Sequence, residues 1–327
     1  MNSLSEIQSA IAPELDALNR RIHGALDSSN ELMNRVVEGY LTTKGKQIRP
    51  ILVILAARLL GTVNDNVIRA AAAVEMLHNA SLIHDDVVDD TDTRRGLPTI
   101  NAVWDNHIAV LVGDFFVSNS LQQAIDTDDI RVVGTIASLG KLLSLGEIDQ
   151  IYNARFHRLT EEAYFGVISR KTASLFVACV EIGAYAVGIA ADDTRLRALK
   201  EFTELLGRCF QIKDDIFDYF SDSRIGKPTG NDLREGKVTL PLLHALDGDD
   251  PETRRMNALV QSETLSQEDI EALIEFAKSR GGIDYAYTVM ERMRTEAVAI
   301  LRREFAADNQ KANTFIEIFD YIITRDN

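Results

Sequence analysis

Apolar residues recur at helical spacing along almost the whole chain of 327 residues, and no segment shows sustained alternation of apolar and polar positions. Only six prolines interrupt the pattern. The pattern therefore predicts an all-α protein in which strands are hard to place. The expected helices cover about residues 5–37, 50–60, 65–90, 101–125, 129–153, 161–190, 194–220, 238–246, 252–262, 267–279, 283–306 and 311–324.

Local signals predict several helix ends and one buried face. Thr160 precedes two glutamates and predicts an N-cap, and Ser266 with Asp269 three residues later predicts a capping box. Near the end of the chain, apolar residues repeat at alternating spacings of four and three, which predicts a core-facing stripe. The stripe consists of Ala286, Met290, Met293, Ala297 and Ile300.

Composition narrows the class of protein. Apolar residues make up 46% of the chain and the formal net charge is −15, which suits a globular protein. No basic stripe is present, which argues against nucleic acid as a partner. No linker rich in proline, serine or glycine marks a boundary, so a single domain over residues 1–327 is expected. Any anionic ligand must then be held by local cations.

The cysteines and the apolar segments predict a soluble, cytoplasmic protein. Cys179 and Cys209 lie in apolar helical contexts without metal-ligand spacing, so both are expected to be reduced core thiols. Residues 1–18 carry three acidic side chains and no unbroken apolar run, unlike a signal or transit peptide. The apolar stretch 51–60 is interrupted by Arg58 and is too short to span a membrane.

Two acidic pentads carry the strongest functional signal. The sequences are D-D-V-V-D at 85–89 and D-D-I-F-D at 214–218, each at the end of an apolar segment with helical periodicity. Positions i and i+4 of a helix share a face, so Asp85 lies above Asp89, and Asp214 above Asp218. Such like charges repel unless a cation lies between them, and oxygen ligands suit Mg²⁺. One pentad alone could be a solvated helix end, but two next to apolar segments indicate a substrate with a charged head and an apolar tail.

Cationic residues surround the pentads in sequence. The segment G-K-Q-I-R-P at 45–50 places two cations on a turn that enters a helix, which suits diphosphate binding, although alone it resembles an ordinary solvated loop. Arg94 and Arg95 follow the first pentad and point in different directions. Lys171 lies among apolar residues, where an unpaired ammonium group would be costly. The polar segment 221–237 follows the second pentad and is interpreted as a mobile lid.

Taken together, the motifs resemble those of the trans-polyprenyl diphosphate synthases. They are G-K-Q-I-R-P, L-I-H-D-D-V-V-D-x-x-D-x-R-R-G, the Lys171-Thr172 pair, F-Q-I-K-D-D-I-F-D and G-K-x-x-G-x-D-L-x-E-G-K-x-T-L-P, in family order over residues 45–243. The resemblance implies a single-domain barrel of long helices around a central cavity and a homodimer. It also implies Mg²⁺-assisted condensation of isopentenyl diphosphate with an allylic diphosphate such as farnesyl diphosphate.

The resemblance assigns roles residue by residue. The catalytic residues would be Asp85, Asp89, Arg94, Lys171, Asp214 and Lys227. Mg²⁺, with three ions expected per active site, would be bound by Asp85, Asp89, Asp214 and Asp218. Isopentenyl diphosphate would be bound by Gly45, Lys46, Arg49, His78 and Arg95; His78, taken alone, reads as a core histidine. The allylic diphosphate would be bound by Arg94, Lys171, Thr172, Gln211, Lys227 and Lys237.

Residues before the first pentad bear on product length. Ala80 and Ser81 lie about one helical turn below Asp85 and are small, whereas short-chain members of the family have a large aromatic residue there. Met76 and Leu77 would border the next isoprene unit, because a turn rises about 5.4 Å. This favours a medium- or long-chain product, plausibly for a quinone side chain. Phe115, Phe116 or a residue further along that helix could form the tunnel floor, although aromatic residues in such a position are more often core.

Three alternative functions are open at this point. A short-chain farnesyl or geranylgeranyl synthase would share all the motifs except the small residues before Asp85. A class I terpene cyclase usually replaces the second aspartate motif, and here that motif is intact. A non-catalytic synthase subunit would typically have lost aspartates or cations, and the sequence shows no such loss.

Overall fold

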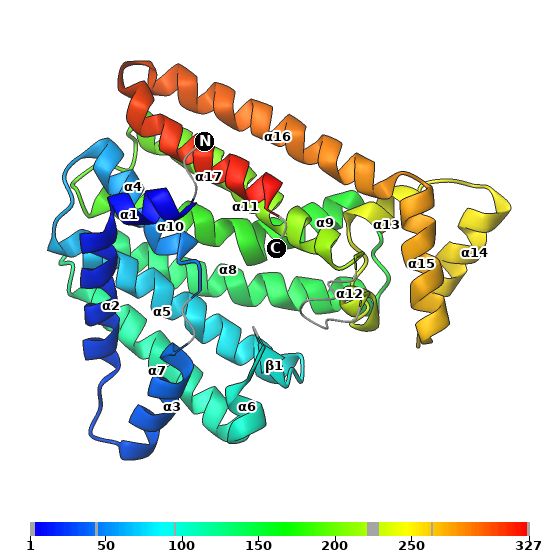
Figure 1. Ribbon diagram of the computed structural model, residues 1–327, viewed down its shortest axis with the longest axis horizontal. Coiled ribbons are helices and arrows are strands. Elements are labelled where there is room, and N and C mark those ends of the chain that lie inside the picture. The colour runs from blue at the N-terminus through cyan, green and yellow to red at the C-terminus, as the bar shows by residue number, and fades with distance from the viewer. Residues whose placement is uncertain (1–3, 43–44, 95, 221–228, 263, 326–327) are drawn as a thin grey trace. The chain divides into compact units, whose positions relative to one another are not determined.

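The computed structural model describes residues 4–42, 45–94, 96–220, 229–262 and 264–325, and these residues are largely helical (Figure 1). The helices are α1 (Leu4–Ala10), α2 (Ala12–Leu26), α3 (Glu31–Leu41), α4 (Ile48–Leu60), α5 (Asp65–Val88), α6 (Ile100–Val103), α7 (Asn106–Ile125), α8 (Ile130–Arg155), α9 (Glu161–Ile168), the π-helix η1 (Ser169–Ala173), α10 (Ser174–Tyr185), α11 (Thr194–Phe217), α12 (Asn231–Arg234), α13 (Leu240–Ala245), α14 (Pro251–Val260), α15 (Gln267–Ser279), α16 (Gly282–Glu304), the 3-10 helix η2 (Ala306–Asp308) and α17 (Asn309–Thr324). The all-α prediction is confirmed.

Within the described ranges, strand is limited to one short antiparallel pair, β1 (Thr93–Arg94) and β2 (Leu97–Pro98). Three predicted helices are each interrupted, and the one expected at 101–125 is divided into α6 and α7. The single helix expected at 5–37 is three helices, and Asn30 caps the third by accepting a hydrogen bond from the Met33 backbone N–H at 3.0 Å. The helix expected at 161–190 contains η1 and ends at Tyr185. The sequence pattern did not predict these breaks, because apolar residues recur on both sides of each.

The chain divides into two compact units. Unit 1 comprises Met1–Lys141, Leu175–Thr203 and Leu301–Ile318, and unit 2 comprises Leu142–Ser174, Glu204–Ile300 and Phe319–Asn327. The expectation of one domain over the whole chain remains a prediction.

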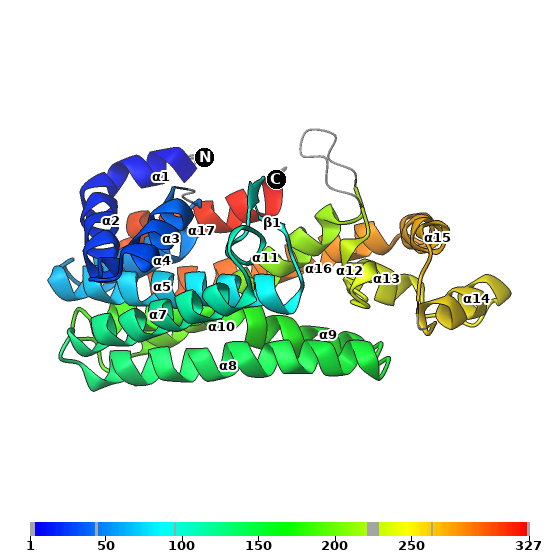
Figure 2. The same ribbon diagram turned by 90° about the horizontal axis from the view of Figure 1, so that it is seen from below.

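In unit 1, α5 and α7 lie side by side (Figures 1 and 2). Small residues allow the two backbones to approach. Ser120 on α7 donates its hydroxyl to the Ala73 carbonyl of α5 at 2.7 Å. At Gly113 an added Cβ would lie 2.2 Å from Nε2 of His84, so only glycine fits at this contact. Since His84 directly precedes the first pentad, this packing positions the functional end of α5.

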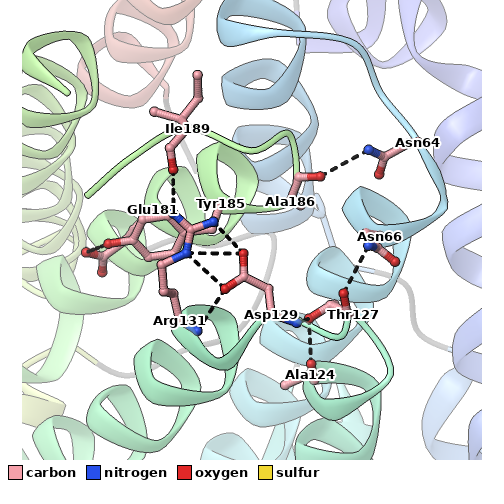
Figure 3. Close-up of polar contacts among 10 residues, drawn as sticks. All are labelled: Asn64, Asn66, Ala124, Thr127, Asp129, Arg131, Glu181, Tyr185, Ala186 and Ile189. Atoms are coloured by element: carbon pink, nitrogen blue, oxygen red, sulfur yellow. Dashed lines mark hydrogen bonds and ion pairs between the residues drawn. The ribbon is translucent and has the colours of Figure 1, made fainter. Parts of the chain in front are cut away.

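Polar contacts join three loops at another part of unit 1 (Figure 3). Asn64 and Asn66 donate their side-chain amides, each at 3.0 Å, to the carbonyls of Ala186 and Thr127. Arg131 binds the Asp129 carboxylate through Nε and the NH2 group, and it also donates to the Ile189 carbonyl at 2.7 Å. These bonds satisfy backbone groups that helix ends leave without partners.

Unit 2 has its own apolar core around α13, α14 and α15. The buried members of this core are Tyr219, Leu233, Leu242, Ala245, Leu246, Met256, Val260, Ile270, Leu273, Ile274, Phe276 and Ala277. The predicted capping box of Ser266 and Asp269 and the predicted Thr160 N-cap are both confirmed. In the α16 stripe, the first four predicted residues are buried, whereas Ile300 is half-buried.

Both cysteines are free and buried, as predicted. Burial raises the pKa of each thiol well above its usual value, so neither is a reactive thiolate. Among the described helices, α7 alone is long and apolar enough to cross a membrane, a test that core helices of soluble proteins also pass. Part of α7 packs on α5, as expected for a core helix.

Candidate active site

The first pentad lies at the C-terminal end of α5 in unit 1. The Asp89 backbone N–H donates to the Asp85 carbonyl at 2.8 Å, so the helical turn continues through the pentad and both half-buried carboxylates lie on one face. Asp86 is buried and points elsewhere. The first and fifth aspartates are therefore the ones placed to bind a ligand.

The buried Asp86 is held by Arg94 on β1. The Arg94 Nε donates to Oδ1 of Asp86 at 2.8 Å, and a terminal nitrogen lies 2.7 Å from the same oxygen. Burial alone would lower the pKa of Arg94, but the hydrogen bond and charge of Asp86 outweigh it and raise that pKa. The strand pair thus places Arg94 against the pentad, while its predicted role in binding the allylic diphosphate remains a prediction.

The predicted isopentenyl diphosphate residues are also in unit 1. Gln47 adopts the left-handed conformation, with φ of 52°, and its side chain bonds Asn19 at 3.0 Å, which shapes the turn before α4. The Lys46 carbonyl accepts a hydrogen bond from Gln8. Arg49 lies over the Phe176 ring at 5.6 Å, and His78 is buried. Gly45 precedes this turn. Their shared role remains a prediction.

The predicted chain-length residues line α5 before the pentad. Met76, Leu77 and Ala80 are buried, and Ser81 is half-buried. The Ser81 hydroxyl donates to the His78 carbonyl at 2.9 Å, so it is satisfied within its own helix and behaves as a small side chain. Of the two candidate floor residues, Phe116 is fully buried and packs edge-on against Tyr40, as a core residue would.

The second pentad ends α11 in unit 2, and its members have three different environments. Asp214 is 40% exposed and pairs with Arg325 at the end of α17. Asp218 accepts the backbone N–H groups of Asn231 and Asp232, each at 3.0 Å, and so anchors α12. Asp215 is buried, and within the described residues its hydrogen-bond donors are the neutral side chains of Tyr164 and Gln211.

Asp215 is the centre of a hydrogen-bonded chain. It accepts the Tyr164 hydroxyl at 2.6 Å and the Gln211 amide N–H at 2.8 Å, while Gln211 accepts the Thr172 hydroxyl at 2.7 Å. Burial raises the pKa of Asp215 to about 7, against the lowering effect of the bonds from Tyr164 and Gln211. Burial and the neighbouring carboxylates also raise the pKa of Asp232.

Lys171 lies in η1, a π-helical turn of the kind often found at functional sites. Its ammonium group pairs with Glu147 on α8 and lies 3.3 Å from Oε1 of Gln150. This arrangement requires glycine at position 146, because a Cβ there would lie 2.7 Å from the Lys171 backbone nitrogen. The ion pair with Glu147 offsets the free-energy cost of placing the Lys171 ammonium group among apolar residues.

One cavity of about 150 Å³ in unit 2 collects four of the residues predicted for the allylic diphosphate. They are Lys171, Thr172, Gln211 and Lys237. Asp215 and Tyr164 line the same cavity. Arg95, Lys227 and residues 221–228 of the predicted lid lie outside the described residues, so their assignments remain predictions.

Comparison with known proteins identifies the family of this chain. The family model described as Polyprenyl synthetase matches residues 30–277. The chain belongs to the polyprenyl synthetase family. It is 35% identical over 298 residues to octaprenyl diphosphate synthase of Haemophilus influenzae, covering 90% of this chain and 88% of the relative. The predicted enzyme class, a polyprenyl diphosphate synthase, is thereby confirmed.

Two solved structures resemble the whole synthase. A decaprenyl diphosphate synthase from Rhodobacter capsulatus has a TM-score of 0.91 and 32% identity, covering 99% of this chain and 100% of the other. A polyprenyl synthase from Caulobacter crescentus, complexed with calcium and isoprenyl diphosphate, has a TM-score of 0.90 and 29% identity, covering 99% and 98%. The names octaprenyl and decaprenyl favour the medium- to long-chain interpretation over the short-chain alternative.

The donor set of this synthase fits a hard divalent cation bound together with a substrate. Within the described ranges, no three His, Cys, Asp or Glu side chains are grouped closely enough to hold a metal ion by themselves. Mg²⁺ commonly uses one or two carboxylates and completes its shell with phosphate oxygens and water. In unit 1, the half-buried Asp85 and Asp89 at the end of α5 form one such pair. In unit 2, the half-buried Asp214 and Asp218 at the end of α11 form another.

Sequence reasoning missed several residues of the synthase. Glu147 and Arg325 bind the predicted residues Lys171 and Asp214, from 24 and 111 residues away. Tyr164 binds Asp215, which was not predicted as a site residue, from 51 residues away. Arg325 gave one weak signal, a lone cation after an apolar helix at the end of the chain. The buried second aspartate of each pentad gave none, because its spacing does not distinguish it from the ligands.

Proposed function

We propose that this synthase condenses isopentenyl diphosphate with an allylic diphosphate, such as farnesyl diphosphate, and makes a medium- or long-chain polyprenyl diphosphate. The observation that carries the proposal is the cavity lined by Lys171, Thr172, Gln211 and Lys237. Two ammonium groups and two neutral polar groups around one small space suit a diphosphate. These residues come from three separate segments of the sequence.

The chemistry requires a leaving group to be stabilised. The allylic C1–O bond breaks, the electron pair leaves with the diphosphate, and an allylic carbocation remains. Lys171 and Lys237 stabilise the developing negative charge, and fixed charges of this kind are most effective in a site that excludes water. The alkene of isopentenyl diphosphate attacks the cation, and the released diphosphate accepts the proton that is then lost.

Asp85, Asp89, Asp214 and Asp218 are the proposed ligands of Mg²⁺, with three ions in the substrate complex. When bound, the metal neutralises diphosphate oxygens and assists departure of the leaving group. The relative from Caulobacter crescentus contains calcium and isoprenyl diphosphate together, which supports a divalent cation in this synthase. Asp86 and Asp215 are buried and bound by Arg94 and Tyr164, so neither is a proposed metal ligand.

The remaining assignments follow the motifs. Gly45, Lys46, Arg49, His78 and Arg95 would bind isopentenyl diphosphate, and Arg94 and Lys227 would assist the allylic diphosphate. The small residues Ala80 and Ser81 support a long product, plausibly a quinone side-chain precursor, because they leave room below Asp85.

We also propose a cytoplasmic homodimer. In unit 2, α8 exposes a row of large apolar side chains, which is typical of an interaction surface. The row comprises Leu142, Leu145, Ile148, Ile151 and Tyr152. The two free, buried cysteines are consistent with a reducing compartment.

Product analysis tests the function directly. The chain is incubated with farnesyl diphosphate, isopentenyl diphosphate and Mg²⁺, and the dephosphorylated products are separated by chromatography. We expect products longer than four isoprene units, and none when a chelator removes the metal. A cyclic hydrocarbon from farnesyl diphosphate alone would indicate a cyclase, and products that stop at three or four units would indicate a short-chain synthase. The absence of any condensation would contradict the proposal.

A further inference from the structure

Tyr164 lies on α9 and connects this helix to the end of α11. Its hydroxyl donates to Oδ2 of Asp215 at 2.6 Å. The helix begins at the Thr160 N-cap, and the Tyr164 ring packs edge-on against Phe165 with centroids 5.4 Å apart. The hydroxyl is therefore carried on a ring whose position is set by its own helix.

Three hydrogen bonds connect Tyr164 to Thr172 through Asp215 and Gln211, and the donor of each is defined. One carboxylate oxygen of Asp215 accepts the O–H of Tyr164, and the other accepts an N–H of Gln211. The Gln211 amide is then oriented with its oxygen toward Thr172, whose hydroxyl it accepts. These hydrogen bonds determine which atoms of Gln211 and Thr172 face the cavity.

The cost of burying Asp215 indicates that this hydrogen-bonded network does more than stabilise packing. Within the described residues Asp215 has no cationic hydrogen-bond partner. Burying such a carboxylate is expensive, and an apolar residue of similar size would commonly be as stable or more stable. All four members, Tyr164, Asp215, Gln211 and Thr172, line the 150 Å³ cavity together with Lys171 and Lys237. A polar network is thus maintained where the proposed anion would lie.

The second N–H of the Gln211 amide is also consistent with a ligand in this cavity. An amide nitrogen carries two hydrogens, and the bond to Asp215 uses one of them. No other partner of this nitrogen is found in the part of the chain that the structure describes. With the amide held in this orientation, the second hydrogen remains available to an oxygen of a ligand.

We propose that Tyr164 is a positioning residue for the allylic diphosphate, acting through Asp215 to hold the Gln211 amide with its nitrogen available as a donor. The inference rests on the proposed function, because the ligand concerned is the allylic substrate. Tyr164 touches neither the reacting atoms nor a proposed metal ligand in this scheme.

The test compares Tyr164→Phe with Tyr285→Phe in the full-length chain. The control is matched, because Tyr285 also donates its hydroxyl to a carboxylate of α9, Glu161, at 3.1 Å, but does not line the cavity. Binding of farnesyl diphosphate with Mg²⁺, without isopentenyl diphosphate, is measured by calorimetry. KM for each substrate, kcat and thermal unfolding are measured alongside.

For Tyr164→Phe we expect Kd and KM for farnesyl diphosphate to rise about ten-fold, the effect of one lost hydrogen bond to a charged group. KM for isopentenyl diphosphate should stay within about two-fold of wild type, the usual scatter of a remote change. Tyr285→Phe should leave both substrates unchanged. A merely structural Tyr164 would instead lower the melting temperature and affect both substrates equally, or neither, and that result would overturn the inference.

A second variant keeps the test decisive if Tyr164→Phe does not fold. Asp215→Asn has the same shape and removes a buried charge, but it offers one acceptor oxygen in place of two. We expect unchanged or higher thermal stability with weaker farnesyl diphosphate binding. The double variant Tyr164→Phe/Gln211→Ala should bind no more weakly than Gln211→Ala alone, because both changes remove the same contact. Losses that multiply would contradict a role through Gln211.

The two proposals fail in different ways. If wild-type protein neither binds nor extends farnesyl diphosphate, the proposed function is wrong and the inference is wrong with it. If wild-type protein does both and Tyr164→Phe behaves like Tyr285→Phe, only the inference is wrong.

Discussion

Asp129 in unit 1 and Asp215 in unit 2 are held by opposite kinds of partner. Asp129 binds the guanidinium group of Arg131 within a polar cluster that joins loops (Figure 3). The hydrogen bond from Arg131 lowers the pKa of Asp129 despite partial burial. Asp215 receives a hydroxyl and an amide and lines a cavity, and burial raises its pKa.

The difference separates a structural carboxylate from one at a site. A carboxylate used for stability is paired with a cation, so the fold gains from its charge. Asp215 lies beside a cavity and receives neutral donors from the described residues. The cations that line this cavity, Lys171 and Lys237, pair instead with Glu147 and Glu235. Replacing acidic residues in the two regions should therefore have different consequences.

The largest effect is expected at the pentads. Asp85→Ala or Asp214→Ala should lower kcat by at least about a hundred-fold, the scale of losing one strong electrostatic group in a transition state. Asp129→Ala, the matched control from the structural cluster, should retain wild-type turnover. Steady-state assays with Mg²⁺ measure both. Near-wild-type turnover in either pentad variant would refute the proposed active site.

The next largest effect is expected at Ser81, if this residue of α5 faces the substrate. The Ser81 hydroxyl is satisfied within its own helix, so Ser81→Phe should disturb that helix little. The ring should block chain growth about one turn below Asp85 and shift the longest product to roughly three or four isoprene units. Chromatography of dephosphorylated products shows the length. A wild-type product at a comparable rate would mean that Ser81 does not face the tunnel.

Gly146→Ala should affect stability and activity together. The added Cβ would meet the Lys171 backbone, which cannot yield as a flexible side chain can, so about 1–3 kcal/mol of stability should be lost. Displacement of η1 should also lower kcat. The control on the same helix is Gly134→Ala, where nothing lies within 4 Å, and it should stabilise the protein by about 0.5–1 kcal/mol. Chemical denaturation and activity assays should separate the two, and identical behaviour would contradict the close contact.

The smallest effect is expected at Asp129. Asp129→Asn should lower the free energy of unfolding by about 1 kcal/mol, since the ion pair is partly exposed, and should leave kcat unchanged. Because the folded-state pKa is lowered, the contribution is present above the unfolded pKa of about 3.9 and is lost as pH falls through the folded value. The free energy of unfolding, measured by denaturation at neutral and at acidic pH, should therefore fall less with pH in the variant than in the wild type. An equally steep decline would show that the pair contributes nothing.

The sequence by itself determined the features that depend on neighbouring residues. The helical spacing, the Thr160 and Ser266 caps and the apolar approach to each pentad are properties of contiguous segments, and all reappear in the structure. The motifs also identified the family, because their order and spacing are specific. Predictions fell short at the breaks within 5–37, 101–125 and 161–190, where apolar residues recur on both sides although the backbone changes.

Tertiary structure decided which residue of each motif does what. Within D-D-x-x-D, spacing cannot tell that Asp86 turns to Arg94 or that Asp215 turns to Tyr164, 51 residues away. Nor can it predict that Arg325 reaches Asp214 across 111 residues. Such partners are set by how helices pack, since side chains distant in sequence meet only after their helices are placed. The sequence motifs therefore identify which residue types are present, whereas contacts between residues distant in sequence determine how each polar side chain is oriented.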